Sequence, residues 1–403
     1  MTVPLAGLRV LDLSRVLAGP WCTQLLGDLG AEVTKIERPG VGDDTRHWGP
    51  PWHGDGERRV AAYFLSTNRG KKSAAIDFAT PQGAELVRRL AEQSDVVVEN
   101  YRVGGLAKFG LDAASLRAAN SKLIVASITG FGQDGPYAER AGYDFIIQGM
   151  GGMMSVTGLP DGEPGGGPMR AGVAIADLFT GMYACVAILA ALHRREMTGE
   201  GAHIDMALFD TQLAMLANQA SNALISGQEP PRQGNTHPNI VPYQPFDAAD
   251  QPIIIAVGND RQFARLAELC GHGEWAQDKR FATNGARVAN RGEIVPLVAA
   301  CIARKPAAEW FEQLDAAGIP AGPINRVSQA LADVQAQHRG MVRMLSGVPL
   351  VGSPVRIDGK RADSELPPPA LGEHTDAVLR QLGVAADEIE RLRARGTIGG
   401  LVN

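Results

Sequence analysis

The sequence predicts an α/β protein with a doubly wound parallel sheet as its large domain and a smaller α+β domain. Three observations indicate this fold class. Short apolar runs alternate with helical patterns over the first 130 residues, as in parallel sheets covered on both faces. The chain of 403 residues is long enough for two domains. A polar, Pro-rich segment, Gln228–Asn235, interrupts the pattern as a domain boundary would.

The large domain is expected to begin with a strand at Leu8–Leu13 and a helix at Trp21–Leu29, with Pro20 near the helix start. Thr80 and Pro81 have the residue types of an N-cap and a first helical position, so a helix should follow them. Further strands of the sheet are expected at Glu32–Ile36, Ser73–Asp77, Asp95–Glu99 and Lys122–Ile128.

The Gly-rich segment 149–167 is predicted either as a long surface loop or as a mobile cover over a nearby site. After it we expect a long apolar helix that Asp177 opens, a strand at His203–Leu208 and a helix at Thr211–Ser226. The smaller domain and the tail are expected to contain a strand at Gln251–Val257 and helices at Gln262–Leu269, Ala307–Ala317 and Glu388–Arg395.

Composition disfavours several classes of function. The net charge is −5 and there is no long basic run, so nucleic-acid binding has no support. The N-terminus lacks the pattern of a secretory signal, and the apolar stretch 171–192 is interrupted by Asp177, which indicates a buried helix and not a membrane span. Four scattered cysteines indicate free thiols in a reducing cytoplasm, and the histidine spacing predicts no metal site.

Asp177 itself has two interpretations from the residues alone. A carboxylate at the start of a buried helix can be an N-cap worth ~1 kcal/mol. It can also be a nucleophile held in a site that excludes water. The turn after the first strand, Ser14–Pro20, is not GxGxxG, so a dinucleotide cofactor is disfavoured despite the predicted fold.

Several segments in a fixed order resemble one family. They are Leu11–Pro20, Lys35–Gly40, Val98–Tyr101, Ile128–Gln133, Arg140–Asp144 and Leu371–Thr375. Over about Leu5–Leu382 the chain resembles the class III CoA-transferases, the CaiB/BaiF-type family of formyl-CoA transferase and carnitine CoA-transferase. The segments Asn235–Phe246 and Val257–Asp260 are most similar to the branch that moves CoA between dicarboxylates, as succinyl-CoA–glutarate (hydroxymethylglutarate) CoA-transferase does.

The resemblance implies an interlocked homodimer in which both ends of the chain complete the large domain. The implied division is residues 1–226 for the first part of the CoA domain, 227–328 for the small α+β domain and 329–403 for the returning segment. It also implies coenzyme A as a substrate and Asp177 as the nucleophile. The acyl group would pass through an aspartyl anhydride and CoA through an aspartyl-CoA thioester.

Matching positions give the expected site. Tyr143 and the loop glycines Gly151 and Gly152 would support the reacting groups, because backbone N–H groups of glycine can approach an oxyanion closely. Arg15, His237 and Asn259 are weaker candidates for contact with the acid substrate. Arg15 and Leu17 depart from the His and Gln of formyl-CoA transferase, which disfavours formate and oxalate. CoA contacts are expected from Val16, Ala18, Arg38, Ile76, Lys108 and Phe109.

Two other functions stay open on the same scaffold. The 2-methylacyl-CoA racemases carry a His base where this chain has Tyr143. Tyrosine titrates near 10 and is a poor base at neutral pH, so racemization is disfavoured. A CoA-binding protein without turnover is the third possibility, although Asp177 and the Gly-rich segment are both present.

Overall fold

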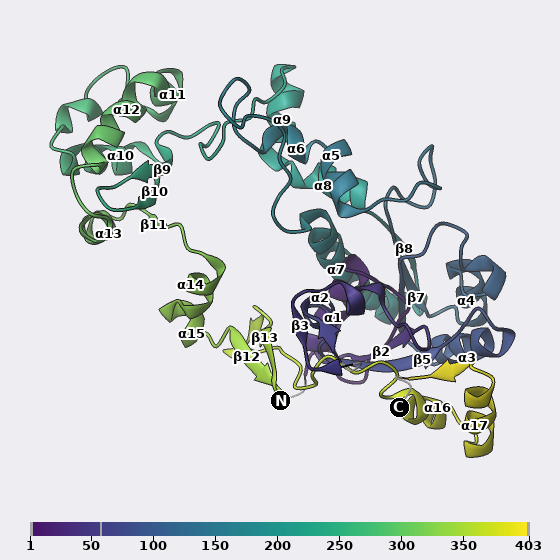
Figure 1. Cartoon of the computed structure of the whole chain (residues 1–403). Coiled ribbons are helices and arrows are strands. Elements are labelled where there is room, and N and C mark those ends of the chain that lie inside the picture. Colours follow the sequence, from purple (N-terminus) through teal and green to yellow (C-terminus); the bar gives the residue numbers. More distant parts are fainter. Residues whose placement is uncertain (1–2, 57–58, 401–403) are drawn as a thin grey trace. The chain divides into compact units, whose positions relative to one another are not determined.

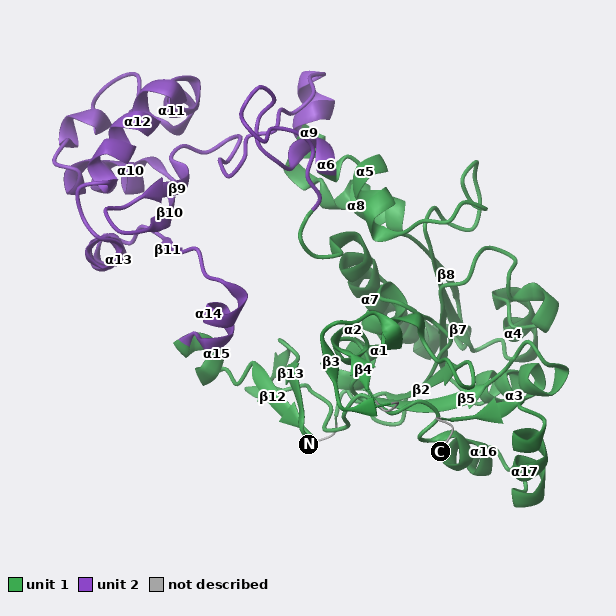
Figure 2. Ribbon diagram, in the orientation of Figure 1, with its two compact units in different colours: residues 1–153, 171–221, 334–403 green, residues 154–170, 222–333 purple. Residues whose placement is uncertain are grey.

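The computed structural model describes residues 3–56 and 59–400 (Figure 1). It divides into two compact units (Figure 2). Unit 1 contains residues 1–153, 171–221 and 334–403, and unit 2 contains 154–170 and 222–333. The segment 154–170 therefore groups with unit 2, whereas the sequence-based division assigned it to the large domain.

Unit 1 is built on a seven-stranded sheet with the order β16-β5-β2-β1-β6-β7-β8. All neighbouring strands run parallel except β16, which the end of the chain adds antiparallel to β5. The doubly wound parallel sheet is thus confirmed, with one edge strand that was not predicted. The strands are β1 Arg9–Asp12, β2 Glu32–Glu37, β5 Lys71–Ile76, β6 Val96–Glu99, β7 Ile124–Thr129, β8 His203–Ala207 and β16 Ile398–Gly399.

The strand order reverses between β1 and β6. From β1 the chain builds outward through β2 and β5, whereas β6, β7 and β8 extend the other side. The loops after β1 and β6 therefore leave the sheet in opposite directions at the same edge. In open α/β sheets the crevice at this point is where ligands bind.

Helices cover both faces of the sheet and bury alternate strand residues. Leu11 and Val97 belong to the core under α3, α4, α16 and α17, whereas their neighbours Val10 and Val96 belong to the core under α1 and α7. This alternation is the period of two expected of strands. The helices are α1 Ala18–Asp28, α3 Pro81–Glu92, α4 Ala113–Ala119, α7 Ile175–Thr198, α16 Thr375–Gln381 and α17 Ala386–Ala394.

Local signals place several helix ends. The Thr80 hydroxyl accepts a hydrogen bond from the N–H of Gly83 at 3.1 Å, so the predicted cap of α3 is confirmed. Gly199 ends α7 in the left-handed conformation at φ 74°, which glycine adopts without side-chain strain. Helix α7 is long and apolar enough to cross a membrane by length and composition alone. Its buried residues pack in the core with α1, as predicted for a core helix.

The structure corrects two other expectations. The segment 149–167 is not one long loop, because α5 (Asp144–Met150) and α6 (Met153–Val156) occupy its first part. The helix predicted at Thr211–Ser226 is two helices, α8 (Leu208–Met215) and α9 (Ala217–Ser226). Ala217 has a positive φ of 44°, which breaks a continuous α-helix.

The remaining elements of unit 1 lie between β2 and β5, between β6 and α4, or after residue 333. Sequence periodicity predicted none of them because each is short. They are η1 Asp44–His47, β3 Trp52–His53, β4 Val60–Ala61, α2 Ala62–Leu65, η3 Ala107–Phe109, α15 Val334–His338, β12 Val342–Leu345, β13 Val348–Val351, β14 Arg356–Ile357 and β15 Lys360–Arg361.

Unit 2 has its own α+β core. A three-stranded antiparallel sheet in the order β11-β10-β9 packs with helices around one apolar cluster. Arg287, buried at its centre, donates to the carbonyls of Val241 and Phe281 and pairs with Asp260. The elements are β9 Tyr243–Asp247, β10 Pro252–Ala256, α10 Asp260–Leu269, η4 Gly273–Ala276, α11 Asn284–Ala289, α12 Arg291–Ile302, α13 Ala307–Ala316, β11 Ala321–Pro323 and α14 Val327–Ala332.

Buried ion pairs connect strands of the large sheet, among them Lys71 at the start of β5 and Asp12 at the end of β1. The Lys71 ammonium lies 3.0 Å from the Asp12 carboxylate, and both side chains have no exposed surface. Lys71 also donates to the Pro20 carbonyl and to Asn68. Burial alone would raise the pKa of Asp12, but Lys71 and Lys35 hold it at about 2. Burial lowers the pKa of Lys71 to about 8, although the negative charge of Asp12 acts to raise it.

Replacing Lys71 by methionine should lower the free energy of unfolding by about 3–5 kcal/mol, because the Asp12 carboxylate then loses its buried counter-charge. Urea denaturation of the purified variant measures this. The double variant Asp12→Asn/Lys71→Met should recover part of the loss, since it removes both charges. Equal instability of the single and double variants would contradict the pairing.

Candidate active site

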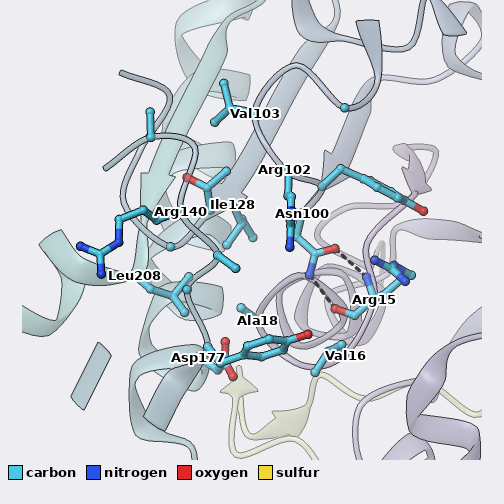
Figure 3. A pocket seen from close by; sticks show the side chains of 18 residues that line it. Arg15, Val16, Ala18, Asn100, Arg102, Val103, Ile128, Arg140, Asp177 and Leu208 are labelled. Atoms are coloured by element: carbon cyan, nitrogen blue, oxygen red, sulfur yellow. Dashed lines mark hydrogen bonds between the residues drawn. The ribbon is translucent and has the colours of Figure 1, made fainter. Parts of the chain in front are cut away.

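A cavity of about 420 Å³ lies at the carboxyl ends of β1 and β6, where the strand order reverses (Figure 3). Its walls come from the loops after β1, β6 and β7 and from the starts of α1 and α7. Asp177 lies among the lining side chains, with Val16 and Ala18 beside it. The other lining residues used below are Arg15, Asn100, Tyr101, Arg102, Arg140 and Tyr143.

Asp177 is the third residue of α7 and not its N-cap, so the capping interpretation is wrong. The N-cap residue is Ala174, which has no side chain for the task. The carboxylate of Asp144 takes that role from 32 and 33 positions earlier in the chain, accepting hydrogen bonds from the N–H groups of Ala176 at 2.9 Å and Asp177 at 3.4 Å. Gln148 donates to the other Asp144 oxygen at 2.7 Å and holds it in place. The Asp177 side chain is thereby left free.

The environment of Asp177 disfavours its charge. Burial raises the pKa of this carboxyl to about 7, and the nearby Asp144 carboxylate adds to the shift. Within residues 3–56 and 59–400, no hydrogen bond or ion pair reaches the Asp177 carboxylate. The positive end of α7 favours the anion but does not outweigh burial. A poorly solvated carboxylate that is half ionised near neutral pH suits nucleophilic attack.

A second cavity of about 220 Å³ adjoins the first, because Arg15 and Tyr101 line both. Arg38 and Ile76, two of the predicted CoA contacts, line this second cavity together with Phe78. The ring of Phe109 packs against Phe78 at 5.6 Å, and the Lys108 ammonium lies 4.8 Å from the Phe109 ring. Four of the six predicted CoA-binding residues therefore line the two cavities, whereas Phe109 and Lys108 lie beside Phe78, outside the lining, and the contact of all six with CoA stays a prediction.

Arg15 stands at the junction of the two cavities. Its guanidinium pairs with Asp44 at 3.1 Å and lies over the Tyr101 ring at 5.0 Å. Its backbone is clamped by Asn100, whose side chain accepts from the Arg15 N–H at 2.8 Å and donates to the Arg15 carbonyl at 2.6 Å. Arg15 is thus positioned to contact a ligand that spans both cavities.

Of the predicted supporting residues, Tyr143 lies at the Asp177 cavity and the two loop glycines do not line it. Tyr143 lines the first cavity and is 63% exposed. Gly151 ends α5, where a Cβ would meet the Gln212 side chain at 2.4 Å, and Gly152 adopts φ +82°. Neither glycine is among the residues that line the Asp177 cavity, so their role toward an oxyanion stays a prediction.

The two candidates in unit 2 have structural partners of their own. The Asn259 side chain accepts the N–H of Gln262 at 3.0 Å and caps α10. The His237 ring lies 5.2 Å from that of Tyr243, and its Nδ1 accepts the N–H of Asn239. Their contact with the acid substrate stays a prediction.

The structure adds residues that sequence reasoning missed. Asn100 and Arg102 follow the end of β6 directly, so their place after a buried strand was a usable signal. Arg140 lies 4.5 Å over the Tyr137 ring. In the described part of the chain, neither Arg102 nor Arg140 has a carboxylate partner. No local signal marked Asp144, because its cap acts on a distant helix.

Tyr63 is another unpredicted neighbour. Burial raises the pKa of its phenol to about 12, and the charge of Asp177 adds to the shift. Tyr63 lies in α2 and packs edge-on against Trp48, with ring centroids 5.3 Å apart. Its hydroxyl therefore stays neutral at physiological pH and cannot serve as a base there.

Comparison with known proteins agrees with this geometry. The pattern of CoA-transferase family III matches residues 5–375. A succinate–glutarate CoA-transferase of Agrobacterium fabrum is 51% identical over 94% of this chain and 96% of its own length. The succinyl-CoA:glutarate CoA-transferase of Mus musculus is 42% identical over 98% of this chain and 90% of its own. The crystal structure of a CaiB/BaiF family protein from Brucella suis superposes with a TM-score of 0.84 at 52% identity, covering 95% of this chain and all of the other.

The raised pKa of Asp177 predicts a pH-dependent effect of Asp177→Asn on stability. The folded-state pKa of about 7 exceeds the usual unfolded value near 3.9, so the wild-type protein loses stability as pH rises between these values. Asparagine does not titrate. The melting temperature of the variant relative to wild type should therefore be a few degrees higher at pH 8 than at pH 4.5.

Differential scanning fluorimetry at the two pH values gives this comparison. Asp134→Asn is a matched control, because Asp134 is exposed. A stability difference for Asp177→Asn that does not change with pH would contradict the unfavourable burial of the ionised carboxylate.

Proposed function

This chain belongs to CoA-transferase family III, and we propose that it moves CoA from succinyl-CoA to a dicarboxylic acid such as glutarate, with Asp177 as the covalent nucleophile. The observation that carries the proposal is the placement of Asp177. Asp177 lines the 420 Å³ cavity at the sheet edge, together with the three arginines Arg15, Arg102 and Arg140. The printed activities of the Agrobacterium and mouse relatives support the choice of donor and acceptor.

The chemistry proceeds by substitution at three carbonyl carbons, those of the succinyl group, of Asp177 and of the acceptor acid. An Asp177 oxygen attacks the thioester carbon of succinyl-CoA, the C–S bond breaks, and CoA thiolate leaves a mixed anhydride. The thiolate attacks the aspartyl carbonyl, and succinate leaves an aspartyl-CoA thioester. The acceptor carboxylate attacks that thioester and releases the thiolate. The thiolate then attacks the acyl carbonyl of the second anhydride, which gives the new acyl-CoA and restores the Asp177 carboxylate.

This sequence of steps requires a dry and preorganised site. Anhydrides hydrolyse in water, so the reacting carbonyls must be sheltered. The burial that raises the pKa of Asp177 to about 7 provides such shelter. The Asp144 carboxylate caps α7 and fixes the backbone of the nucleophile without bonding to its side chain. The site therefore supplies an oriented and weakly solvated nucleophile.

The two cavities give CoA an extended binding path. We place the adenine end near Ile76 and its phosphates near Arg38 in the second cavity, and the thioester beside Asp177 in the first. Lys108 adds positive charge near the outer end of this path. Arginine suits phosphate because its planar guanidinium donates two parallel hydrogen bonds.

Arg102 and Arg140 favour a dicarboxylate as the acid. Both line the Asp177 cavity and lack a carboxylate partner among the described residues. A monocarboxylate uses its single carboxylate for attack, whereas a dicarboxylate has a second one left for these cations. His237 and Asn259 stay as further candidates for the same contact. A racemase is disfavoured because the named relatives are transferases.

We also propose that two copies of the chain form an interlocked homodimer, in the cytoplasm. One face of α7 supports this: Phe179, Met182, Tyr183 and Val186 recur at helical spacing and are 39%, 48%, 49% and 63% exposed. An apolar stripe of this size beside the nucleophile is unusual on a free surface. A second copy of the chain would cover it.

Covalent trapping tests the nucleophile. After incubation with succinyl-CoA, hydroxylamine should convert the aspartyl thioester to a hydroxamate that maps to Asp177 by mass spectrometry. Asp177→Ala should show no adduct and lose about 10³-fold or more in kcat, since the nucleophile is absent. An unmodified wild-type protein that binds CoA would contradict the mechanism, and exchange of an α-proton with solvent deuterium would then point to a racemase.

The same assay distinguishes the acceptor class. Glutarate should accept CoA from succinyl-CoA, whereas butyrate, which lacks the second carboxylate, is the matched control and should accept it poorly. Equal rates with both acids would overturn the dicarboxylate assignment and leave the covalent mechanism intact.

Val186→Glu should weaken the proposed dimer, because it places a charge in the apolar face of α7. Analytical ultracentrifugation should show a sedimentation coefficient that falls toward the monomer value on dilution. Gln93→Glu adds the same charge at an exposed position of unit 1 and should leave the dimer unchanged. A wild-type protein that sediments as a monomer would refute the dimer.

A further inference from the structure

The loop between β1 and α1 contains a strained residue next to the nucleophile. Val16 has φ +69°, in the left-handed region. A β-branched residue is rarely found there, because its side chain crowds the backbone. Such conformations cost about 1–3 kcal/mol and persist only where the surroundings enforce them. Val16 and Ala18 both line the cavity that holds Asp177.

A buried ion pair enforces this conformation. The Val16 N–H points at the Asp43 carboxylate, with both oxygens at 3.3 Å. Asp43 pairs with Lys35 at 2.9 Å, and neither side chain has exposed surface. Burial alone would lower the pKa of Lys35, but Asp43 and neighbouring carboxylates raise it above its ordinary value, so the pair stays charged. Thr45 fixes Asp43 further, donating to it from its backbone N–H and its hydroxyl.

The adjacent peptide groups are held in the same way. Lys35 donates to the Ser14 carbonyl at 2.7 Å, and Asn100 donates to the Arg15 carbonyl at 2.6 Å. Ser14 lies four positions before Ala18, and Arg15 lies four positions before Gly19. If α1 began one turn earlier, these two carbonyls would accept the helical hydrogen bonds of the Ala18 and Gly19 N–H groups. Within the described residues, the N–H groups of Ala18 and Gly19 have no acceptor. The first turn of α1 is thereby left with free donors.

This turn is packed tightly against the nucleophile's helix. Gly181 lies four positions after Asp177 on α7, and a Cβ there would be 2.5 Å from the Ala18 carbonyl oxygen. A shift of the backbone at Val16 would therefore move the wall of the cavity beside Asp177. Displacements of about 1 Å at a reacting site can cost about 100-fold in rate.

We propose that Asp43 is a positioning residue for CoA transfer, which acts through Val16 by holding the loop after β1 in the left-handed conformation that sets the first turn of α1 beside Asp177. Lys35 supplies the counter-charge that keeps Asp43 ionised and in place. The inference rests on the proposed function of Asp177 but adds a residue that does not itself touch the reacting atoms.

Asp43→Asn keeps the size of the side chain and weakens the hold on the Val16 N–H. It should lower kcat for succinyl-CoA and glutarate by about 10–100-fold, with a smaller change in KM. Adding Val16→Gly to Asp43→Asn should raise kcat at least about fivefold above that of Asp43→Asn alone, because glycine adopts φ +69° without side-chain strain. In the wild-type background the same substitution should give no gain, since Asp43 already enforces the conformation.

Asp28→Asn is the matched control. Asp28 is a buried carboxylate paired with Arg69 at 2.5 Å, at the far end of α1 from Val16. Its variant should lose stability, keep the kcat of the folded enzyme, and gain nothing from Val16→Gly. A loss of kcat in Asp43→Asn that Val16→Gly does not relieve would overturn the positioning role.

Measuring the affinity for CoA distinguishes a failure of this inference from a failure of the proposed function of Asp177. If the wild-type enzyme binds CoA but is never acylated, the function of Asp177 is wrong. In that case the role of Asp43 requires calorimetry to show weaker CoA binding in Asp43→Asn that Val16→Gly reverses. If Asp43→Asn, Val16→Gly and the double variant all bind CoA with the wild-type dissociation constant, the positioning role of Asp43 is refuted.

Discussion

The arrangement of the large unit depends on charged side chains in and next to its sheet that are buried without exposed surface. Lys71 pairs with Asp12, and Lys35 pairs with Asp43. An unpaired ion in such a place costs several kcal/mol, so each charge fixes the position of its partner. The partners come from β1, β2, β5 and the loop at Asp43. These ion pairs therefore determine the path of the loop after β1. Because this loop lines the cavity, they also determine the position of that part of the cavity wall.

The same constraint distinguishes Asp177, the proposed nucleophile, from neighbouring carboxylates. Cations hold Asp12 at a pKa of about 2, whereas burial without a cation raises that of Asp177 to about 7. Asp144, which is also buried, uses its oxygens on the backbone of α7 and on Gln148. Asp177 is thus a half-buried carboxylate whose side chain is not committed to structure. The absence of a counter-charge beside the Asp177 carboxylate lowers the stability of the fold and increases the reactivity of this group, a combination that is common at catalytic sites.

The described chain also leaves surface that a folded protein ordinarily covers. The apolar face of α7 lies on the helix that carries Asp177, so covering this face and sheltering the proposed anhydride intermediates are linked requirements. Water excluded from that face is also excluded from the approach to the nucleophile. The proposed dimer would therefore contribute to catalysis as well as to stability.

The sequence by itself determined the parts that depend on local patterns. Apolar runs such as Val96–Val98 predicted the parallel strands because both faces are buried, and Thr80 with Pro81 predicted the start of α3. Family motifs predicted the role of Asp177 and the CoA contacts, and the structure places Asp177 in a cavity. Short elements, such as β3, β4 and β16, were missed because two residues carry no periodicity.

Only the tertiary structure decided which groups are free to react. The cap from Asp144, the clamp from Asn100 and the hold of Asp43 on Val16 each join residues between 27 and 85 positions apart. Hydrogen bonds over such separations leave no periodic trace in the sequence, because they form only once the sheet brings the loops together. For the same reason the sequence suggested Asp177 as a cap, whereas the fold supplies another carboxylate for that role and leaves Asp177 free.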